Sequence, residues 1–439
     1  MSDYMYMLES HLSPKQSRVV ADVEAAAAHA NVTLFLTGGA MRDMFAGQPV
    51  RDLDFTVEGN GLKLGRLLAQ GSGIKLLNED EDRRAAELVF PGDVRAAVAM
   101  AHQARYGKAG TKPRIQPATI HEDLRGRDFS INSIALSLNR ASRGLLLDPN
   151  NGLGDLERKE IRAISNYTLY DEPVRLLRML RLKVRLGFTI EPRTQLQYEN
   201  AREARIQDQI APRLLFEELR AMADEPHPAD LVQLLDQEGL LGLFQEKLTG
   251  PKLPAAGLGK LQKARQLIPY GVDLKIRSLG LFLYLFTEKL TPKENAELIS
   301  RVHMHKAEAA SWQKLERATR SLERALKSAR LHKPSLVYKT LLEAPGEHVL
   351  FLLIRSEHRI VQDRIRNFLQ KYLSTAQEIT EQDVIAAGGV PGSPKWGQAR
   401  EEAIAARLDG RTRKPAPPPA PETPIVQARP SPRLAMARR

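Results

Sequence analysis

Short hydrophobic runs alternate with polar residues between Asn31 and about Leu147. The runs VTLFLTG, RDLDFTV and AELVF are rich in β-branched and aromatic residues and are separated by helix-like stretches. Runs of this length and composition are typical of strands, whereas the stretches between them have helical spacing. The sequence therefore predicts one domain that mixes strands and helices in this part of the chain.

From about Asp155 onward the strand pattern nearly disappears. Helical periodicity dominates the segments EPVRLLRMLRLKVRLGF, APRLLFEELRAMA and PADLVQLLDQEGLLGLF, and much of 256–374. The rest of the chain is predicted to be an all-α array. Its basic stretch KAEAASWQKLERATRSLERALKSARLHK is interpreted as a solvated helix face, with contact to a nucleic-acid backbone as the alternative.

Composition excludes several classes of protein. An apolar content of 42% is enough for buried cores, and the absence of cysteine excludes a disulfide partner or a thiolate metal site. The longest apolar runs, LFLYLF and VLFLLI, are far shorter than the roughly 20 residues of a membrane helix, and the N-terminus has no basic leader. We expect a cytoplasmic protein with no membrane partner.

The charge is concentrated at the C-terminal end. The net charge is +12, and residues 411–439 hold seven Lys or Arg and one Glu, which accounts for half of that excess. The other half is spread over about 410 residues, which permits a polyanionic partner but does not require one. Eight prolines among the last 29 residues predict a disordered tail at 411–439.

The stretch LFLTGGAMRDMFAG combines a strand end, two glycines and a helix. Gly38 and Gly39 follow the apolar run, and AMRDMFAG has the composition of a helix. Glycine lets a phosphate approach the backbone, and a helix N-terminus offers free N–H groups to an anion. Arg42, one turn into this helix, would add positive charge to such a phosphate site.

Asp52 and Asp54 follow in RDLDF, at positions i and i+2. On a strand this spacing directs both carboxylates to one face, while Leu53 and Phe55 face the core. Two carboxylates form half of a Mg²⁺ site, which substrate phosphates and water complete. Taken alone, the pair of aspartates also fits a polar strand end. Beside the glycines it indicates a nucleoside triphosphate bound through Mg²⁺, and a reaction in which a hydroxyl attacks a phosphorus atom in line.

The stretch TGGAMRDMFAGQPVRDLDF resembles the signature of the class II CCA-adding tRNA nucleotidyltransferases and the related bacterial poly(A) polymerases, within the polymerase-β-like nucleotidyltransferase superfamily. The family pattern is G-G-x-x-R-D, a short helix, and then a basic residue with D-x-D. The matching positions are Gly38, Gly39, Arg42, Asp43, Arg51, Asp52 and Asp54.

Further blocks resemble the family in the same order. EDLRGRDFSINSIAL resembles the block that contacts the sugar and triphosphate: Arg127, Asp128 and Asn132 match, while Gly126 and Ser130 replace the usual Arg and Thr. LLLDPNNGLGDLERKEIRAI, DEPVRLLRMLRLKVRLGF and the stretch ITEQDVIAAGGVPGSPKWGQAREEAIAARLDG resemble later blocks. The resemblance spans about residues 30–410.

The resemblance implies an α+β fold, in which a polymerase-β-like head with a mixed sheet and helices precedes an all-α neck, body and tail. The expected division is an N-terminal helical extension at 1–30, the nucleotidyltransferase head at 31–150, a nucleotide-selecting and RNA-binding neck at 151–225, a tRNA-binding helical body at 226–410, and the tail at 411–439.

Base selection in the family is assigned to an E-D-x-x-R motif. A carboxylate accepts from the exocyclic amine that adenine and cytosine share, and an arginine donates to a ring acceptor. The resemblance places these roles at Glu172 and Arg175, with Arg178 meeting the incoming nucleotide. This chain has Asp171–Glu172 where the family has Glu-Asp, so the reading carboxylate is one methylene longer and discrimination between A and C is in question. Without the resemblance, an amphipathic helix with a charged face would explain the segment.

A second departure affects the metal site. Family members carry a third acidic residue on a later strand, and matching VRAAVAMAHQARYGKAG to that strand places it at Ala97, with the usual following Arg at His102. Alanine cannot bind a metal. Asp93 and Glu87 are the nearby acids that offer a replacement carboxylate, although Asp93 has the pattern of a turn residue.

The resemblance implies a template-independent enzyme that transfers NMP from CTP or ATP to the 3′ end of tRNA with Mg²⁺. Asp52 and Asp54 are the expected catalytic metal ligands; the expected nucleotide-binding residues are Gly38, Gly39, Arg42, Asp43, Arg127, Asp128, Asn132, Glu172, Arg175 and Arg178. CC-only, A-only and poly(A) addition remain open. So does a weakened or non-catalytic RNA- and nucleotide-binding relative, because of Ala97.

Overall fold

The computed structural model describes residues 3–107, 111–269, 271–272, 274 and 276–410. By its internal contacts the chain divides into two compact units. The first comprises residues 1–268, 273–323 and 345–357, and the second comprises 269–272, 324–344 and 358–439. The predicted disordered tail at 411–439 lies outside the described residues.

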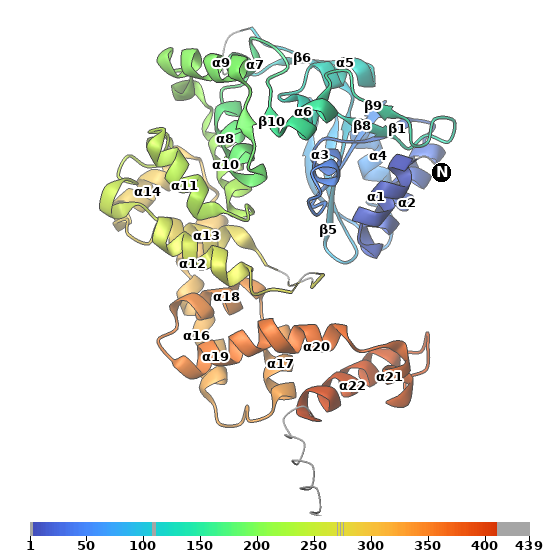
Figure 1. The fold of residues 1–439 in the computed structure, drawn as a ribbon, viewed down its shortest axis with the longest axis vertical. Coiled ribbons are helices and arrows are strands. Elements are labelled where there is room, and N and C mark those ends of the chain that lie inside the picture. The colour runs from blue at the N-terminus through green and yellow to red at the C-terminus, as the bar shows by residue number, and fades with distance from the viewer. Residues whose placement is uncertain (1–2, 108–110, 270, 273, 275, 411–439) are drawn as a thin grey trace, which may run out of the picture. The chain divides into compact units, whose positions relative to one another are not determined.

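A seven-stranded sheet forms the N-terminal part of the first unit, in the order β3-β4-β5-β2-β1-β8-β9 (Figure 1). Its strands are β1 (Thr33–Thr37), β2 (Leu53–Glu58), β3 (Lys75–Asp80), β4 (Ala85–Phe90), β5 (Val94–Met100), β8 (Ala135–Ser137) and β9 (Leu146–Leu147). Strands β2 and β5 are parallel and the other pairs antiparallel, so the sheet is mixed. The strands predicted from VTLFLTG, RDLDFTV and AELVF are confirmed as β1, β2 and β4.

Helices cover one face of this sheet. Leu53, Phe55 and Val57 alternate along β2 and are buried on that side. Helix α4 (Gly61–Leu68) packs on β4 and β5, and α2 (Pro14–His29) packs beside α4. A Cβ atom at Gly61 would lie 2.7 Å from the backbone of Ala99, so only glycine permits this close approach.

The opposite face is covered only in part. Helix α5 (Ile120–Arg125) covers the β1 and β8 side through a cluster of Phe35, Ile120, Leu124 and Ala135. A small two-stranded sheet of β6 (His102–Arg105) and β7 (Arg114–Pro117) follows β5 in the chain. On β2 and β5 this face keeps Asp54 and Ala97 partly accessible, which leaves room for a site.

The rest of the first unit is helical, as predicted. Its helices, in addition to α1 (Asp3–His11), are α6 (Gly152–Arg158), α7 (Thr168–Asp171), α8 (Arg175–Leu186), α9 (Pro192–Glu203), α10 (Pro212–Ala223), α11 (Pro228–Gln237), α12 (Ala255–Arg265), α13 (Ser278–Phe286), α14 (Pro292–Arg301), α15 (Lys306–Gln313), α16 (Leu315–Lys327, whose end belongs to the second unit) and α18 (Gly346–Arg355). Two short strands, β10 (Glu160–Ile161) and β11 (Thr189–Ile190), pair in parallel and were not predicted. The lysines and arginines of α16 are exposed, as both the solvated helix face and contact with a nucleic-acid backbone require.

The second unit is also helical. It contains α17 (Pro334–Leu342), α19 (Arg359–Asn367), a π-helical turn at Phe368–Tyr372, α20 (Leu373–Gln377), α21 (Glu381–Ala386) and α22 (Trp396–Gly410). Helices α20 to α22 and the segments between them share an apolar core that includes Val384, Ile404 and Leu408. The mixed sheet followed by helices confirms the expected fold class.

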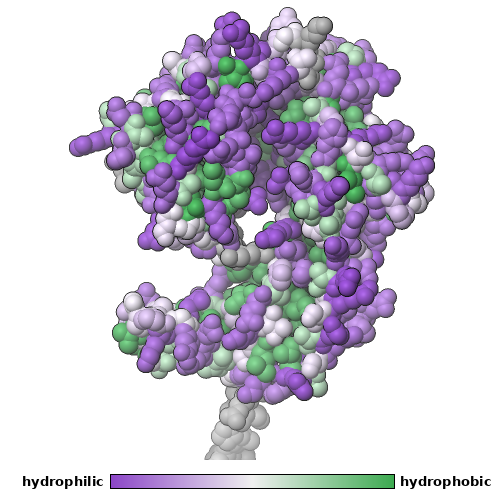
Figure 2. Space-filling model, turned by 180° about the vertical axis from the view of Figure 1, so that it is seen from behind, coloured by the Kyte–Doolittle hydropathy of each residue, from purple (hydrophilic) through white to green (hydrophobic). Residues whose placement is uncertain are grey.

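Hydrophobic side chains are broken into patches on the surface. Figure 2 shows hydrophobic groups between many hydrophilic ones on the face that it displays. Among the described residues, no helix is both long enough and apolar enough to cross a membrane.

Candidate active site

The two glycines lie directly beside Asp54. Strand β1 ends at Thr37, whose register partner on β2 is Asp54, and α3 (Gly39–Phe45) begins immediately after Gly38. Gly38 has φ = +67°, and a Cβ atom there would lie 3.3 Å from Oδ2 of Asp54 and 3.2 Å from a guanidinium nitrogen of Arg127. The backbone N–H of Gly39 donates to the Asp54 carboxylate. Glycine is required at position 38 both by its left-handed backbone and by this crowding.

The two aspartates differ in their surroundings. Strand β2 begins at Leu53, so Asp54 is within the strand and partly buried, whereas Asp52 lies just before it and is exposed. Burial and the charge of Asp52 raise the pKa of Asp54 to about 6, although Arg127 and Arg42 oppose the shift. Loss of hydration beside the surrounding protein raises the pKa of Asp52 as well, and the positive charge of Arg51 opposes that shift. The surroundings of both neighbouring carboxylates therefore disfavour their ionised forms. A bound cation would stabilise the ionised forms and offset this cost.

Arg42 and Arg127 approach this pair from two elements, and Asn132 joins them. Asn132 ends the 3₁₀ turn Ser130–Asn132; its Oδ1 accepts from Arg42 at 2.7 Å, and its backbone oxygen accepts from Arg127 at 3.3 Å. Arg127 also donates to the hydroxyls of Thr37 at 3.2 Å and Thr56 at 3.0 Å. These bonds fix two cationic groups beside Asp54, the charge that triphosphate oxygens require.

Asp43 and Arg51 face protein groups. Arg42 donates to Oδ1 of Asp43 at 2.9 and 2.7 Å, and Arg185 of α8 pairs with its other oxygen. Burial lowers the pKa of Arg185 to about 10, and the charge of Arg42 adds to that shift. Arg51 donates to the backbone oxygen of Asp224 at 2.7 Å. Asp43 thus orients Arg42 and is not open to a ligand.

Asp128 connects the sheet to helix α8. Its carboxylate accepts from Asn132 at 3.0 Å and from Arg178 at 2.7 Å. Burial alone would raise the pKa of Asp128, but Arg178 and Arg175 outweigh it and hold the pKa well below the usual range. A continuous chain of hydrogen bonds therefore runs from Arg42 through Asn132 and Asp128 to α8.

Glu172 and Arg175 form an ion pair at the start of α8. Nε of Arg175 lies 3.0 Å from Oε2 of Glu172, and its guanidinium also lies 5.9 Å from the ring centroid of Tyr106. Arg83, from the turn between β3 and β4, lies 3.6 Å from the other oxygen of Glu172. The proposed base-reading carboxylate is thus held between two arginines.

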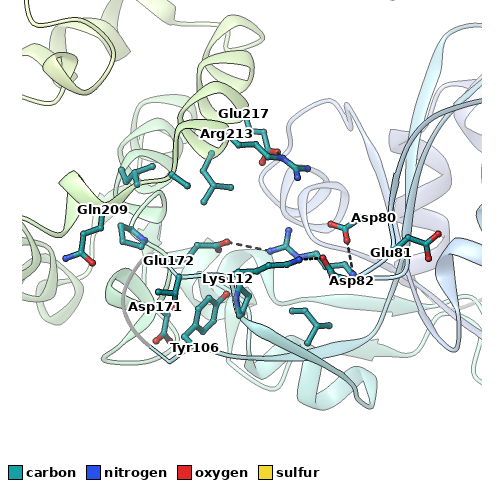
Figure 3. Close-up of a pocket in the computed structure, with 18 of the residues that line it drawn as sticks. Asp80, Glu81, Asp82, Tyr106, Lys112, Asp171, Glu172, Gln209, Arg213 and Glu217 are labelled. Carbon is teal, nitrogen blue, oxygen red and sulfur yellow. Dashed lines mark hydrogen bonds and ion pairs between the residues drawn. The ribbon is translucent and has the colours of Figure 1, made fainter. Parts of the chain in front are cut away.

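A cavity of about 440 Å³ opens beside this pair (Figure 3). Glu172 projects into it from the α7 side; Asp82 lines the opposite side, and Lys112 reaches across to pair with it. Tyr106 and Arg213 contribute to its walls. The volume is within the range of small-molecule sites. Asp52 and Asp54 do not line this cavity.

Position 97 lies next to Asp54. In the parallel pairing of β2 and β5, Asp54 is the register partner of Ala97, and in the antiparallel pairing of β4 and β5, Glu87 is the partner of Ala97. Asp93 lies in the turn between β4 and β5 at φ = +61°. His102, the first residue of β6, donates its backbone N–H to Asp123 at 3.1 Å. The position beside Asp54 thus bears only a methyl group.

Sequence reasoning missed several groups. Arg83, Tyr106 and Arg185 contact residues that it selected, and Arg95 adds a positive charge near Asp52. The 3–4 residue spacing of arginines along α8 was a signal for Arg185. No pattern in the sequence pointed to Arg83 or Tyr106, because Arg83 comes from the turn between β3 and β4 and Tyr106 follows β6, both far from Glu172 and Arg175 in the chain.

The donor set suits a divalent cation that brings ligands of its own. Asp52 and Asp54 supply carboxylate oxygens, and Arg42 and Arg127 leave room for anionic oxygens beside them. Across the described ranges, no group of three or more His, Asp or Glu side chains is gathered closely enough to hold a metal. Phosphate oxygens and water would have to complete the site.

Known proteins resemble this chain in sequence and fold. Residues 34–162 match the family model of the poly A polymerase head domain. The chain is 24% identical over 424 residues to an A-adding tRNA nucleotidyltransferase of Geobacter sulfurreducens, covering 93% of this chain and 47% of that protein. It is 26% identical to the A-adding enzyme of Halalkalibacterium halodurans, covering 89% of this chain and 88% of that protein.

A CC-adding tRNA nucleotidyltransferase of Deinococcus radiodurans is 35% identical over 206 residues, which is 47% of this chain and 54% of that protein. The chain thus spans about half the length of the Geobacter and Deinococcus relatives. Among solved structures, a CCA-adding enzyme in its second apo form matches with a TM-score of 0.53 at 24% identity, covering 94% of this chain and 96% of that chain, and shows the same fold.

The fold and the matched domain show that this chain has a nucleotidyltransferase head. Nucleotidyltransferases of this kind generally use a divalent metal. Residues 34–162 thus match a poly A polymerase head domain, and the chain is similar to A-adding and CC-adding tRNA nucleotidyltransferases.

Proposed function

We propose that the protein is a template-independent RNA nucleotidyltransferase that adds C, A or both to the 3′ end of tRNA. The observation that carries the proposal is the hydrogen-bonded chain from Arg42 and Arg127 beside Asp54, through Asn132 and Asp128, to helix α8 with its Glu172–Arg175 pair. The A-adding and CC-adding relatives support the substrate. Such a substrate would place the protein in the cytoplasm.

The reaction joins the 3′-hydroxyl oxygen of the RNA to the α-phosphorus of CTP or ATP. The hydroxyl loses its proton, the bond from that phosphorus to the next bridging oxygen breaks, and pyrophosphate leaves. Mg²⁺ is the cation that we infer for Asp52 and Asp54; when bound, it offsets triphosphate charge and favours loss of the hydroxyl proton.

The side chains of this protein would act before and during that transfer. Arg42 and Arg127 would bind phosphate oxygens, because each is held rigidly by neighbours and still lies beside Asp54. Gly38 and Gly39 would let the triphosphate approach the backbone. Asp128 and Asn132 would fix these cations and contact the sugar or phosphate.

Base choice would fall to Glu172 and Arg175. The carboxylate would accept from the exocyclic amine of adenine or cytosine, and Arg175 would donate to a ring acceptor, with Arg178 close to the nucleotide. G and U present the opposite pattern and would be rejected. We keep the division into a 1–30 extension, a 31–150 head, a 151–225 neck and a 226–410 RNA-binding body as part of this proposal.

The test is incorporation of labelled CTP and ATP, separately and together, into tRNA transcripts ending before C, before A and before the whole CCA. Addition that stops at one or two C, or at one A, or at three nucleotides identifies the enzyme type, and a long A tract identifies a poly(A) polymerase. Asp52→Ala should abolish the signal.

The second candidate is a weakened or non-catalytic RNA- and nucleotide-binding relative. Ala97 favours it, because the residue beside Asp54 cannot bind a metal. Binding of tRNA and nucleotide without any addition, under conditions in which a family member is active, would establish this candidate over the first.

A further inference from the structure

The open face of the sheet carries a row of side chains that crosses position 97. Thr37, Asp54, Ala97, Glu87 and Asn78 lie on adjacent strands β1, β2, β5, β4 and β3 as successive register partners. Register partners direct their side chains to the same face of a sheet. Glu87 therefore points to the same side as Asp54, one strand beyond Ala97.

We propose that Glu87 provides the third carboxylate of the metal site, in place of the acid that position 97 lacks. The inference rests on the proposed function, since it assigns a further ligand to the same cation. It names a residue on β4, where neither the opening motif nor the family pattern places an acid.

The geometry allows this replacement. Neighbouring strands are about 4.8 Å apart, so Glu87 starts two strand spacings from Asp54. A glutamate is one methylene longer than an aspartate, and the only side chain between the two carboxylates is the methyl group of Ala97. A larger residue at 97 would occupy the space that Glu87 must cross, so the loss of the acid at 97 also opens the path.

Glu87 is free to move into that space. Its side chain is exposed, and it forms no hydrogen bond or ion pair with any part of the chain that the structure describes. Exposed side chains change rotamer within nanoseconds or less, so a cation could draw it inward without rearranging the backbone.

Other acids of strands β3 to β5 and their turns are less suited. Glu79 is paired with Arg66 at 2.8 Å and projects to the helix-covered face. Asp80 is on the open face, but its partner is Ala85, and its carboxylate accepts the backbone N–H of Arg83 at 2.9 Å. Asp93 is in the turn outside the row. Only Glu87 lies in the row of Asp54.

The experiment measures Mn²⁺ affinity of the full-length protein in the presence of CTP, by the loss of the free-ion electron paramagnetic resonance signal. Glu87→Gln should weaken Mn²⁺ binding about tenfold or more. Glu157→Gln, which removes an exposed charge on α6, is the matched control and should leave binding unchanged. The double variant Glu87→Ala with Ala97→Glu should restore affinity to within about threefold of the unmodified protein.

Thermal melting of each metal-free variant separates ligand loss from unfolding. Wild-type Mn²⁺ affinity in a folded Glu87→Gln variant would overturn the proposal. So would a failure of the double variant to restore binding while it remains folded. If the unmodified protein binds Mn²⁺ and CTP through Glu87 but adds nothing to tRNA, the proposed function fails and the assignment of Glu87 stands.

Discussion

At the residue scale, the site raises the pKa of Asp54, and this shift makes the stability of the folded protein depend on pH. Its pKa is about 6 in the folded protein, well above the ordinary value of an aspartate, because burial and Asp52 disfavour its charge. The folded state therefore binds a proton more tightly than the unfolded chain. Without metal, stability from this group is present at low pH and is lost as pH rises from about 4 to about 6.

Replacing Asp54 with Asn should therefore stabilise the metal-free protein by roughly 2 kcal/mol at pH 7.5, and by much less at pH 4. The measurement is urea unfolding at both pH values with a chelator present. Mn²⁺ should stabilise the unmodified protein and not the variant. An Asp54→Asn variant that is less stable at pH 7.5 would contradict the pKa argument.

Glu172 is the second residue whose role can be isolated. Glu172→Ala should lower kcat/KM for the accepted nucleotide about 100-fold, because a hydrogen-bonded pair that reads a base contributes roughly 1–3 kcal/mol of discrimination. Discrimination against UTP and GTP should fall with it. Steady-state incorporation of all four nucleotides measures both effects. A uniform loss with unchanged selectivity would mean that Glu172 only orients Arg175.

At the scale of elements, helix α8 depends on buried ion pairs. The side chain of Arg181 is 13% exposed, and it donates to the buried carboxylates of Glu218 at 2.5 Å and Glu225 at 3.0 Å. Arg181→Ala should cost roughly 3–5 kcal/mol of unfolding free energy, since it leaves the buried carboxylate of Glu218 without its cation, while Glu225 keeps Arg51 at 3.6 Å. Arg213→Ala removes the exposed i,i+4 pair with Glu217 and should cost less than about 1 kcal/mol. Chemical denaturation measures the loss of unfolding free energy in both variants. Equal losses would mean that burial of the ion pair does not determine its contribution to stability.

The same elements show which features could be read from the sequence. Strands β1, β2 and β4 were predicted because each has buried residues that produce a clear hydrophobic run. Strand β3 was missed because five of its six residues are exposed, so it has no such run. The arginine face of α8 was visible as a charged stripe, but its partners Asp43, Asp128 and Glu218 come from distant segments and no local pattern reveals them.

The site was accessible to sequence reasoning to the extent that it is local. Gly38, Gly39 and Asp54 lie within one strand–helix–strand segment, and the structure brings them together through the pairing of β1 with β2. The neighbours of Ala97 depend on the register of β2, β5 and β4, which is set by packing of whole strands. The row that leads to Glu87 therefore becomes visible only when that register is known.

At the scale of the whole molecule, half of the net charge of +12 lies in residues 411–439, which are outside the described structure. If that charge attracts RNA non-specifically, removal of the tail should weaken tRNA binding about tenfold at 50 mM salt and about twofold or less at 200 mM, because counterion release makes such contacts strongly salt-dependent. Filter binding across salt concentrations measures both affinities. A control with the same tail length but its seven Lys and Arg replaced by Gln should behave like the deletion. Equal affinity of the deleted and full-length proteins at 50 mM salt would assign RNA binding to the described residues alone.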